Sequence, residues 1–201
     1  HIVAADEAMR MSGLEMSKEE PTRAACILGT GIGGIHEIEG QKIVLQARGP
    51  RRVSPFFIPK LMSNASAGQA SIRYGLQGTS FSTGSACASA SNAMGMALRT
   101  VQYDDADIVL TGGSEAAITE LSLAGFCSLK ALSKRNDEPH RASRPFDKNR
   151  DGFVMGDGAA ALIFEELEHA QARGARIFAE VVGYGSTDDA HHITAPAENA
   201  M

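Results

Sequence analysis

The stretch that decides the fold is Ser80–Gly113, which reads SFSTGSACASASNAMGMALRTVQYDDADIVLTGG. Residues 80–82 have the pattern of a short strand, residues 88–103 predict a helix, and residues 107–111 predict a buried strand that ends at the glycine pair 112–113. A strand, a helix and a second strand within about thirty residues form a βαβ unit with parallel strands. The sequence therefore predicts an α/β fold.

Cys87 lies where the first of these strands turns into the helix. The start of a helix presents free backbone N–H groups and the positive end of the helix dipole, so it stabilises a thiolate. Cysteine is also a common small core residue, and the position of Cys87 alone leaves both roles open. Cys26, in a predicted strand, and Cys127, in a predicted helical turn, are expected to be core residues.

The helix that follows Cys87 is small and apolar through its first turns, where it carries Ala88, Ala90, Ala93 and Gly95. A helix that is apolar on nearly every face is buried. We therefore expect this helix to lie between two layers of the fold.

The rest of the chain predicts further elements around this unit. Helices are expected at residues 2–14, 35–48, 60–74 and 165–173, with short helices over 115–132. Buried strands are expected at residues 24–29 and 159–164, and a last strand at 177–183. Loops are expected at residues 54–59, 133–151 and 186–201.

Composition excludes several classes of protein. The chain has 201 residues, enough for one domain or part of one, and its formal net charge is −5 with 19 basic and 24 acidic residues. The absence of a long Lys/Arg run argues against a general nucleic-acid or membrane surface. Three widely spaced cysteines without a CxxC pair argue against a disulfide framework and a zinc site. A reducing compartment fits this composition best.

The run Gly29-Thr30-Gly31-Ile32-Gly33-Gly34 matches the spacing of a dinucleotide-binding turn after a strand. That motif also needs an acidic residue at the end of a second strand about twenty residues later, and residues 47–54 contain none. We therefore favour a tight turn that allows close backbone packing.

The histidines and basic residues give weaker signals. His36, His140 and His169 lie in polar surroundings and are expected to be solvated, and the pair 191–192 is weighed as a metal site and given little weight. The stretch 143–154 alternates opposite charges with two phenylalanines and predicts an internally ion-paired loop. Candidate residues for an anion-binding rim are Arg51, Arg52, Lys60, Lys130, Lys134 and Arg135.

Several short segments share one pattern: Gly31–Gly34, Ser54–Pro59, Ser85–Ser89, Gly112–Glu115, Ala131–Ser133 and Ser143–Gly158. Together they resemble the elongating β-ketoacyl-[acyl carrier protein] synthases of the thiolase-like superfamily. The last segment, with Arg-Pro-Phe-Asp and Arg-Asp-Gly-Phe-Val, is the most specific. Polyketide ketosynthases share much of the pattern.

The resemblance implies a thiolase-like layered αβαβα architecture, of which this chain is mainly the N-terminal half of the duplicated fold. Residues 1–185 are expected to form the core of one partial ketosynthase domain, and residues 186–201 the start of the linker to the C-terminal half. The two histidines and the lysine that the family carries in its second half have no counterpart in this sequence, nor has its opening strand and helix. The chain is therefore expected to be a central fragment that cannot decarboxylate malonyl thioesters by itself.

The implied activity is fatty-acid chain elongation by a decarboxylating Claisen condensation. Cys87 takes an acyl chain from acyl carrier protein as a thioester, and its backbone N–H forms half of an oxyanion hole. The implied acyl-pocket residues are Ile32, Phe57, which reaches the pocket from the other subunit of a homodimer, and Phe126. The implied contacts to the carrier protein are Arg51, Arg52 and Lys130.

The resemblance implies no metal, no nucleotide and no cofactor beyond the phosphopantetheine arm that carries the substrates. It implies neither a nucleic-acid nor a membrane partner, and a location in the bacterial cytoplasm or in a eukaryotic organelle. The alternatives are a polyketide-type ketosynthase, a non-catalytic acyl-binding or dimerisation module, and an acyl hydrolase that pairs Cys87 with His191 or His192.

Overall fold

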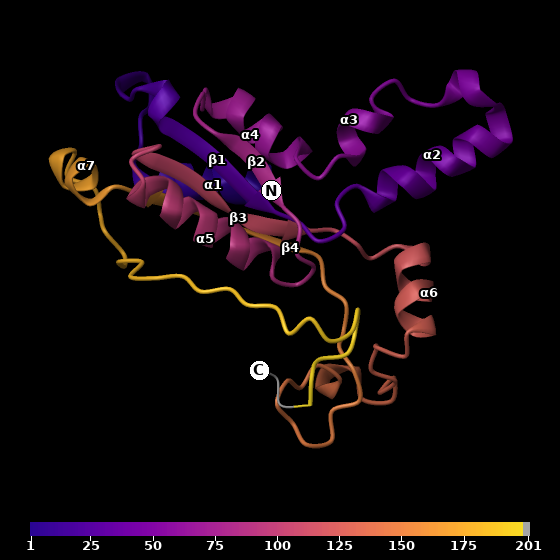
Figure 1. The fold of residues 1–201 in the computed structure, drawn as a ribbon. Coiled ribbons are helices and arrows are strands. Elements are labelled where there is room, and N and C mark those ends of the chain that lie inside the picture. Colours follow the sequence, from indigo (N-terminus) through magenta and orange to yellow (C-terminus); the bar gives the residue numbers. More distant parts are fainter. Residues whose placement is uncertain (199–201) are drawn as a thin grey trace.

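The computed structural model describes residues 1–198 and shows one sheet with helices on both faces (Figure 1). The strands are β1 (Ala24–Gly29), β2 (Ser80–Thr83), β3 (Ile108–Glu115) and β4 (Gly158–Glu165), in the order β2-β1-β3-β4. β1 pairs in parallel with both β2 and β3, and β4 runs antiparallel to β3. The predicted βαβ unit and the α/β class are confirmed, with β1 lying between the two strands of that unit.

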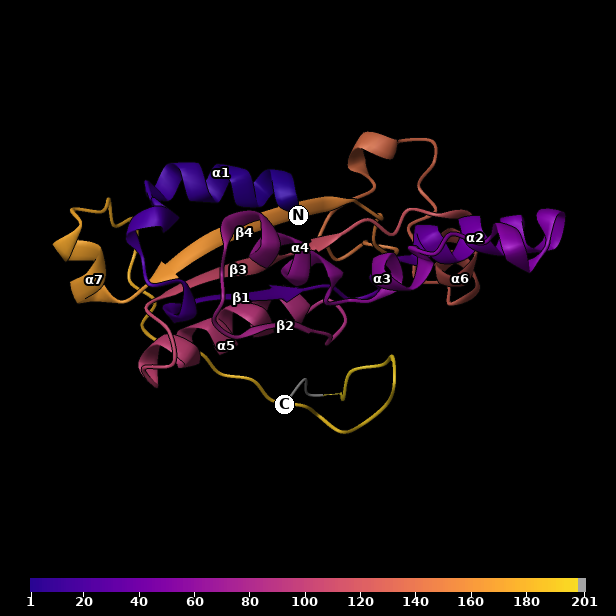
Figure 2. The same ribbon diagram turned by 90° about the horizontal axis from the view of Figure 1, so that it is seen from above.

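The helices are α1 (Ile2–Ser12), α2 (Ile35–Arg48), α3 (Phe57–Leu61), α4 (Ala65–Tyr74), α5 (Ser89–Gln102), α6 (Glu120–Ser128) and α7 (Leu167–Ala172). α1 and α4 cover one face of the sheet and α5 covers the other (Figure 2). α2, α3 and α6 stand away from the sheet, beyond the carboxyl end of β1 (Figure 1).

The central strand β1 is buried along its whole length because both faces of the sheet are covered. Cys26 and Leu28 pack toward α1 and α4, whereas Ala25 and Ile27 pack toward α5. Successive side chains of a strand point to opposite faces, so the continuous apolar run of β1 contributes to two hydrophobic clusters, one on each face of the sheet. The small residues of α5 bring its backbone close to the strands.

Two elements differ from the prediction because a local signal was misread. β3 continues through Gly112 and Gly113 to Glu115, since these glycines permit close approach of neighbouring backbone where a turn was predicted. The segment predicted as a loop at 54–59 contains the start of α3, and the helix predicted from residue 60 is interrupted before α4 begins at Ala65.

Three expectations about burial and strand content are wrong. Residues 177–183 form no strand, although their sequence is apolar. β4 lies at the edge of the sheet, so much of it is exposed. α5 is not covered all round, since Met96 is 39% exposed while Ala93 and Ala97 on the sheet side are buried.

Within residues 1–198, the helices are all too short or too polar to cross a bilayer.

Candidate active site

Cys87 lies in a tight turn between the end of β2 and the start of α5. Its thiol is exposed, and the preceding Ala86 has a φ of 48°, in the left-handed region that residues with a Cβ rarely adopt. The parallel strands β1, β2 and β3 end at the same edge of the sheet, which is where α/β proteins place their ligands. The core role left open for Cys87 is therefore wrong.

Ser89, the first residue of α5, stabilises this turn by hydrogen bonds to its backbone. Its hydroxyl accepts a 2.9 Å hydrogen bond from the backbone N–H of Ser85 and donates a 2.7 Å bond to the carbonyl of Ala86. The hydroxyl of Thr83 donates a 2.7 Å bond to the Ser89 carbonyl. Ser89 is 3% exposed, so its hydroxyl is shielded from water, while Ser85 and Ala86 at the other ends of the two hydroxyl bonds are exposed.

Glycines allow the start of α5 to lie directly on the strand ends. A Cβ placed on Gly29 would lie 2.4 Å from the carbonyl carbon of Ser89, and one on Gly113 would lie 2.5 Å from the Cβ of Ala90. No real Cβ approaches other atoms so closely. The packing of the Cys87 turn against β1 and β3 therefore requires both glycines.

Glu115, at the end of β3, occupies the donors of the glycine-rich turn after β1. Its carboxylate accepts hydrogen bonds from the backbone N–H groups of Gly31, at 2.7 Å, and Ile32, at 3.1 Å. The hydroxyl of Thr30 donates a third bond to it, at 3.0 Å. Amides that would cradle a pyrophosphate in a dinucleotide site thus bind a carboxylate of the same chain, which supports the tight-turn interpretation.

The structure places the predicted acyl-pocket residues on three different elements. Ile32 directly follows Gly31. A Cβ added to Gly31 would lie 3.2 Å from the carbonyl oxygen of Ala86, so the turn that carries Ile32 lies against the Cys87 turn. Phe57 begins α3, and Phe126 lies on α6 with its ring edge-to-face against Phe153 at 5.2 Å between ring centroids. Ile32 is thus close to the Cys87 turn, whereas the other two lie on helices that stand away from the sheet (Figure 1).

A family model described as the N-terminal domain of β-ketoacyl synthases matches residues 1–170. The chain belongs to the β-ketoacyl synthase family. A curated relative, 3-oxoacyl-[acyl-carrier-protein] synthase 2 of Vibrio cholerae, is 50% identical over 198 residues, which are 98% of this chain and 48% of the relative. The chain spans about half the length of the curated relatives it matches.

Solved ketoacyl synthases share the fold. A β-ketoacyl synthase from Burkholderia phymatum is 35% identical with a TM-score of 0.83, over 98% of this chain and 50% of that one. A type II polyketide ketosynthase, solved with its acyl-carrier protein and bound to a hexaketide, is 31% identical with a TM-score of 0.90 over the same shares. The thiolase-like fold class and the family membership predicted from the sequence are confirmed.

The other two cysteines of this ketoacyl synthase chain differ from each other. Cys26 is fully buried in β1, and this burial, opposed by a hydrogen bond with Ser71, raises the pKa of its thiol to about 11. Cys127 is exposed on α6, so its predicted core role is wrong. Cys87 and Cys127 are therefore both accessible to reagents in solvent, and an experiment must show which of the two thiols reacts faster.

The basic residues divide into paired and unpaired groups. Lys60 forms an ion pair with Glu37 at 3.2 Å, and Arg135 forms one with Glu138 at 2.9 Å. Within residues 1–198, Arg51, Arg52 and Lys130 have no ion-pair partner and are exposed. The first two form a turn after α2, and the third follows α6 with a φ of 57°. These three remain available to an acidic partner.

A hollow of about 810 Å³ lies in the charged loop after α6, lined among others by Arg144, Phe146, Arg150 and Phe153. It includes neither Cys87 nor the turn that carries Ile32. Phe153 lines the hollow and also packs against Phe126. Phe126 is therefore the one predicted acyl-pocket residue that lies next to this hollow.

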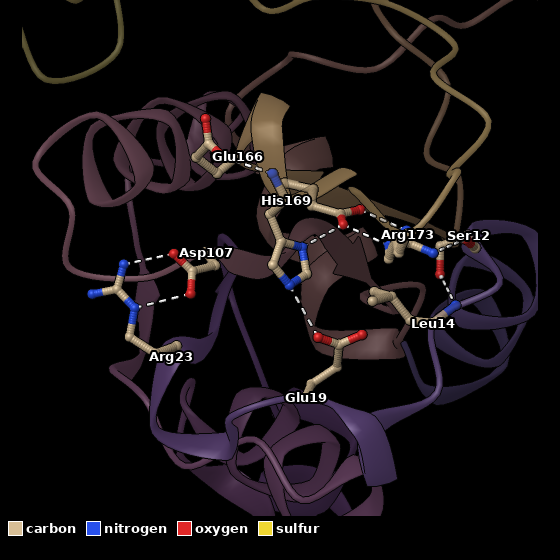
Figure 3. A network of polar contacts seen from close by, with 9 residues as sticks. Ser12, Leu14, Glu19, Arg23, Asp107, Glu166, His169 and Arg173 are labelled. Carbon is tan, nitrogen blue, oxygen red and sulfur yellow. Dashed lines mark hydrogen bonds and ion pairs between the residues drawn. The ribbon is translucent and has the colours of Figure 1, made fainter. Parts of the chain in front are cut away.

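His169 on α7 is not solvated as predicted but lies in a half-buried cluster of charges (Figure 3). Its Nδ1 is 2.7 Å from Glu165 and its Nε2 is 3.0 Å from Glu19, while Arg173 binds the same Glu165 carboxylate at 2.6 Å. Burial of the ring lowers the pKa of His169, but hydrogen bonds and charges from Glu165 and Glu19 outweigh burial and raise it.

This cluster joins distant parts of the chain. Arg173 also donates to the carbonyl of Ser12 at 2.9 Å, so the cluster ties the end of α1 and the segment after it to β4 and α7. The pairing was invisible in the sequence because Glu19 and His169 are 150 residues apart. The sequence signal for part of the cluster is the four-residue spacing of Glu165, His169 and Arg173, although Glu165 ends β4 and Arg173 follows α7.

The histidine pair at 191–192 gives no support to the hydrolase alternative. Nδ1 of His192 accepts hydrogen bonds from the backbone N–H groups of Thr194 and Ala195, at 3.1 Å each, so its ring stabilises a local turn. Among the hydrogen bonds of residues 1–198, none joins His191 or His192 to Cys87.

Proposed function

We propose that this chain forms the acyl-accepting part of a 3-oxoacyl-[acyl carrier protein] synthase that elongates fatty acids. The observation that carries the proposal is the exposed Cys87 thiol in a strained turn at the start of α5, in a chain 50% identical to 3-oxoacyl-[acyl-carrier-protein] synthase 2. Because the chain spans about half of such relatives, the activity of the whole enzyme is part of the proposal.

The first step assigns Cys87 the role of nucleophile. Its thiolate attacks the carbonyl carbon of an acyl thioester on the phosphopantetheine arm of the carrier, and the carbonyl oxygen becomes an oxyanion. The backbone N–H of Cys87, at the start of α5, donates to this oxyanion. The intermediate collapses to acyl-Cys87, and the carrier leaves as a thiolate that takes a proton from solvent.

The second step is the condensation. Malonyl-carrier protein loses CO2, and the carbanion formed attacks the carbonyl carbon of acyl-Cys87, which releases the Cys87 thiolate and leaves a 3-oxoacyl-carrier protein. The histidines that the family resemblance requires for decarboxylation have no counterpart among these 201 residues. We therefore assign acyl acceptance, and not decarboxylation, to the part of the enzyme that this sequence contains.

The binding residues follow from the same proposal. Ile32, Phe57 from the partner subunit of a homodimer, and Phe126 would line the acyl chain, supported by the contact between the Ile32 turn and the Cys87 turn. Arg51, Arg52 and Lys130 would bind the acidic carrier protein, supported by their exposure and lack of ion-pair partners among residues 1–198. A cytoplasmic location and an enzyme without metal or nucleotide complete the proposal.

A polyketide-type ketosynthase is the second candidate. It is favoured by the TM-score of 0.90 with a polyketide ketosynthase, but the identity there is 31% against 50% to the fatty-acid enzyme. Competition between a saturated acyl-carrier protein and a 3-oxoacyl-carrier protein for Cys87 separates the two. Faster acylation of Cys87 by the saturated acyl-carrier protein supports fatty-acid elongation. Faster acylation by the 3-oxoacyl-carrier protein supports the polyketide role.

The nucleophile itself is tested by labelling the folded chain with limiting iodoacetamide or cerulenin and mapping the modified peptide. We expect modification of Cys87 before Cys127, with Cys26 protected by burial. Faster modification of Cys127 or Cys26 would remove the central residue from the proposal.

A further inference from the structure

Tyr184 attaches the irregular segment after α7 to the helix that begins behind Cys87. A Cβ placed on Gly95 of α5 would lie 2.3 Å from Cε2 of Tyr184, so the ring fills the space that this glycine leaves. The Tyr184 hydroxyl donates a 2.6 Å hydrogen bond to Oδ1 of Asn92, three residues earlier on the same helix face. Tyr184 is half-buried, whereas the residues on either side of it are exposed.

Asn92 extends this contact to the Cys87 turn. Its Nδ2 donates a 2.5 Å hydrogen bond to the hydroxyl of Ser85, whose carbonyl accepts a 3.0 Å hydrogen bond from the backbone N–H of Ala88 and so closes the turn around Cys87. An asparagine amide has one accepting and one donating end. Because Tyr184 donates to Oδ1, the donating end of Asn92 faces Ser85, and the tyrosine hydroxyl thereby sets the direction of the second bond.

The turn that receives this bond has a conformation that its surroundings must maintain. Ala86, between Ser85 and Cys87, has a φ of 48°. A residue with a Cβ remains in this region only when neighbouring contacts hold it there. Ser89 binds the backbone of this turn, and Asn92 binds the side chain of Ser85, so the turn is held at two different points.

We propose that Tyr184 and Asn92 are positioning residues for Cys87, acting through a hydrogen-bond chain that runs from Tyr184 through Asn92 to Ser85 and holds the thiol at the start of α5. The inference rests on the nucleophilic role proposed above. It assigns the segment around Tyr184 an indirect influence on the reactivity of Cys87, since Tyr184 lies 97 positions after Cys87 and acts through Asn92 and Ser85.

The test measures the rate constants for alkylation of Cys87 and Cys127 by iodoacetamide in the same folded molecules, with the two modified peptides quantified by mass spectrometry. Exposed Cys127 on α6 serves as an internal control. For Tyr184→Phe, we expect alkylation of Cys87 to slow about 2- to 5-fold, because the relaxed turn moves the thiolate away from the helix N-terminus. The rate at Cys127 and the thermal unfolding midpoint are expected to stay unchanged.

Three further variants sharpen the test. The double variant Tyr184→Phe with Asn92→Ala should be no slower than Asn92→Ala alone, because both changes break one chain. Gly95→Ala should slow Cys87 as Tyr184→Phe does, because it displaces the ring although alanine favours the helix. Tyr103→Phe, at a 66% exposed tyrosine that follows the opposite, C-terminal end of α5, should leave Cys87 unaffected.

The outcomes separate this inference from the function on which it rests. If Cys87 in the unmodified chain reacts no faster than Cys127, both the nucleophilic role and the inference are overturned. If Cys87 reacts faster there but Tyr184→Phe leaves its rate unchanged, the inference alone is overturned. It is also overturned if Tyr184→Phe slows both cysteines equally, or if the two substitutions slow Cys87 independently.

Discussion

The carboxylate of Glu115 lies 2.7 Å from the backbone nitrogen of Gly31 and so joins the carboxyl end of β3 to the turn after β1. The same carboxylate binds the next residue, Ile32, which we propose as part of the acyl pocket. Hydrogen bonds to a charged acceptor are stronger than neutral ones. One side chain therefore sets the position of a proposed substrate contact beside the Cys87 turn.

Replacing Glu115 tests this role. Glu115→Gln removes the negative charge that strengthens the bonds from the Gly31 and Ile32 N–H groups, and its NH2 group faces the Thr30 hydroxyl, so we expect the free energy of unfolding to fall by about 1–3 kcal/mol. Urea denaturation measures the change. Glu7→Gln, at an exposed glutamate of α1, is the matched control and should change the value by less than about 0.5 kcal/mol. An equal effect of the two substitutions would show that the Glu115 contacts contribute little.

Gly113, which allows α5 to pack closely on the sheet, gives a second prediction. Gly113→Ala places a Cβ 2.5 Å from the Cβ of Ala90 and should lower the free energy of unfolding by about 1–3 kcal/mol. In contrast, Gly40→Ala, in α2 with nothing within 4 Å of the added Cβ, should raise it by roughly 0.5–1 kcal/mol. Urea denaturation of both variants checks the pair. A stable Gly113→Ala protein would mean that α5 does not pack on β3 as closely as described.

The His169 cluster gives stability a pH dependence. Because the folded pKa of His169 is raised above its ordinary value of 6.5, its contribution is fully present below about pH 6.5 and is lost as pH rises through the raised folded value. The pKa of Glu165 is lowered, despite burial that raises it, by Arg173 and His169. That contribution is present above about pH 4.5 and is lost as pH falls.

We therefore expect the free energy of unfolding to decline above pH 6.5, by about 1 kcal/mol or less because the ring is partly exposed. His169→Gln should remove most of this decline, measured as urea unfolding at a series of pH values. His36→Gln, at an exposed histidine of α2, should keep it. If His169→Gln retains the full decline, another group is responsible.

Local patterns predicted the regular elements well. The strand at residues 24–29 and the helix at 35–48 have the predicted bounds, because each carries its own start, period and terminating glycine. The Cys87 turn was also found locally, since a strand, small residues and a helix follow one another. The prediction of a strand at residues 177–183 was wrong because an apolar run forms a strand only where another strand pairs with it.

Contacts between distant residues could not be predicted from these patterns. Glu115 and Gly31 are 84 residues apart, and Tyr184 and Asn92 are 92 apart, so neither partner marks the other in the sequence. The same limit explains why His169 was placed in solvent. The exposure of Cys127 was missed because α6 stands away from the sheet, which its apolar sequence does not indicate.

The central claim is that Cys87 accepts the acyl chain, and transfer from a carrier tests it most directly. The folded chain is incubated with a saturated acyl-carrier protein and its intact mass is measured, followed by mapping of the acylated peptide. The account predicts one added acyl group on the peptide that contains Cys87, its release by hydroxylamine, and no acylation of the Cys87→Ala variant. Acylation at Cys127, or transfer that persists in Cys87→Ala, would contradict it.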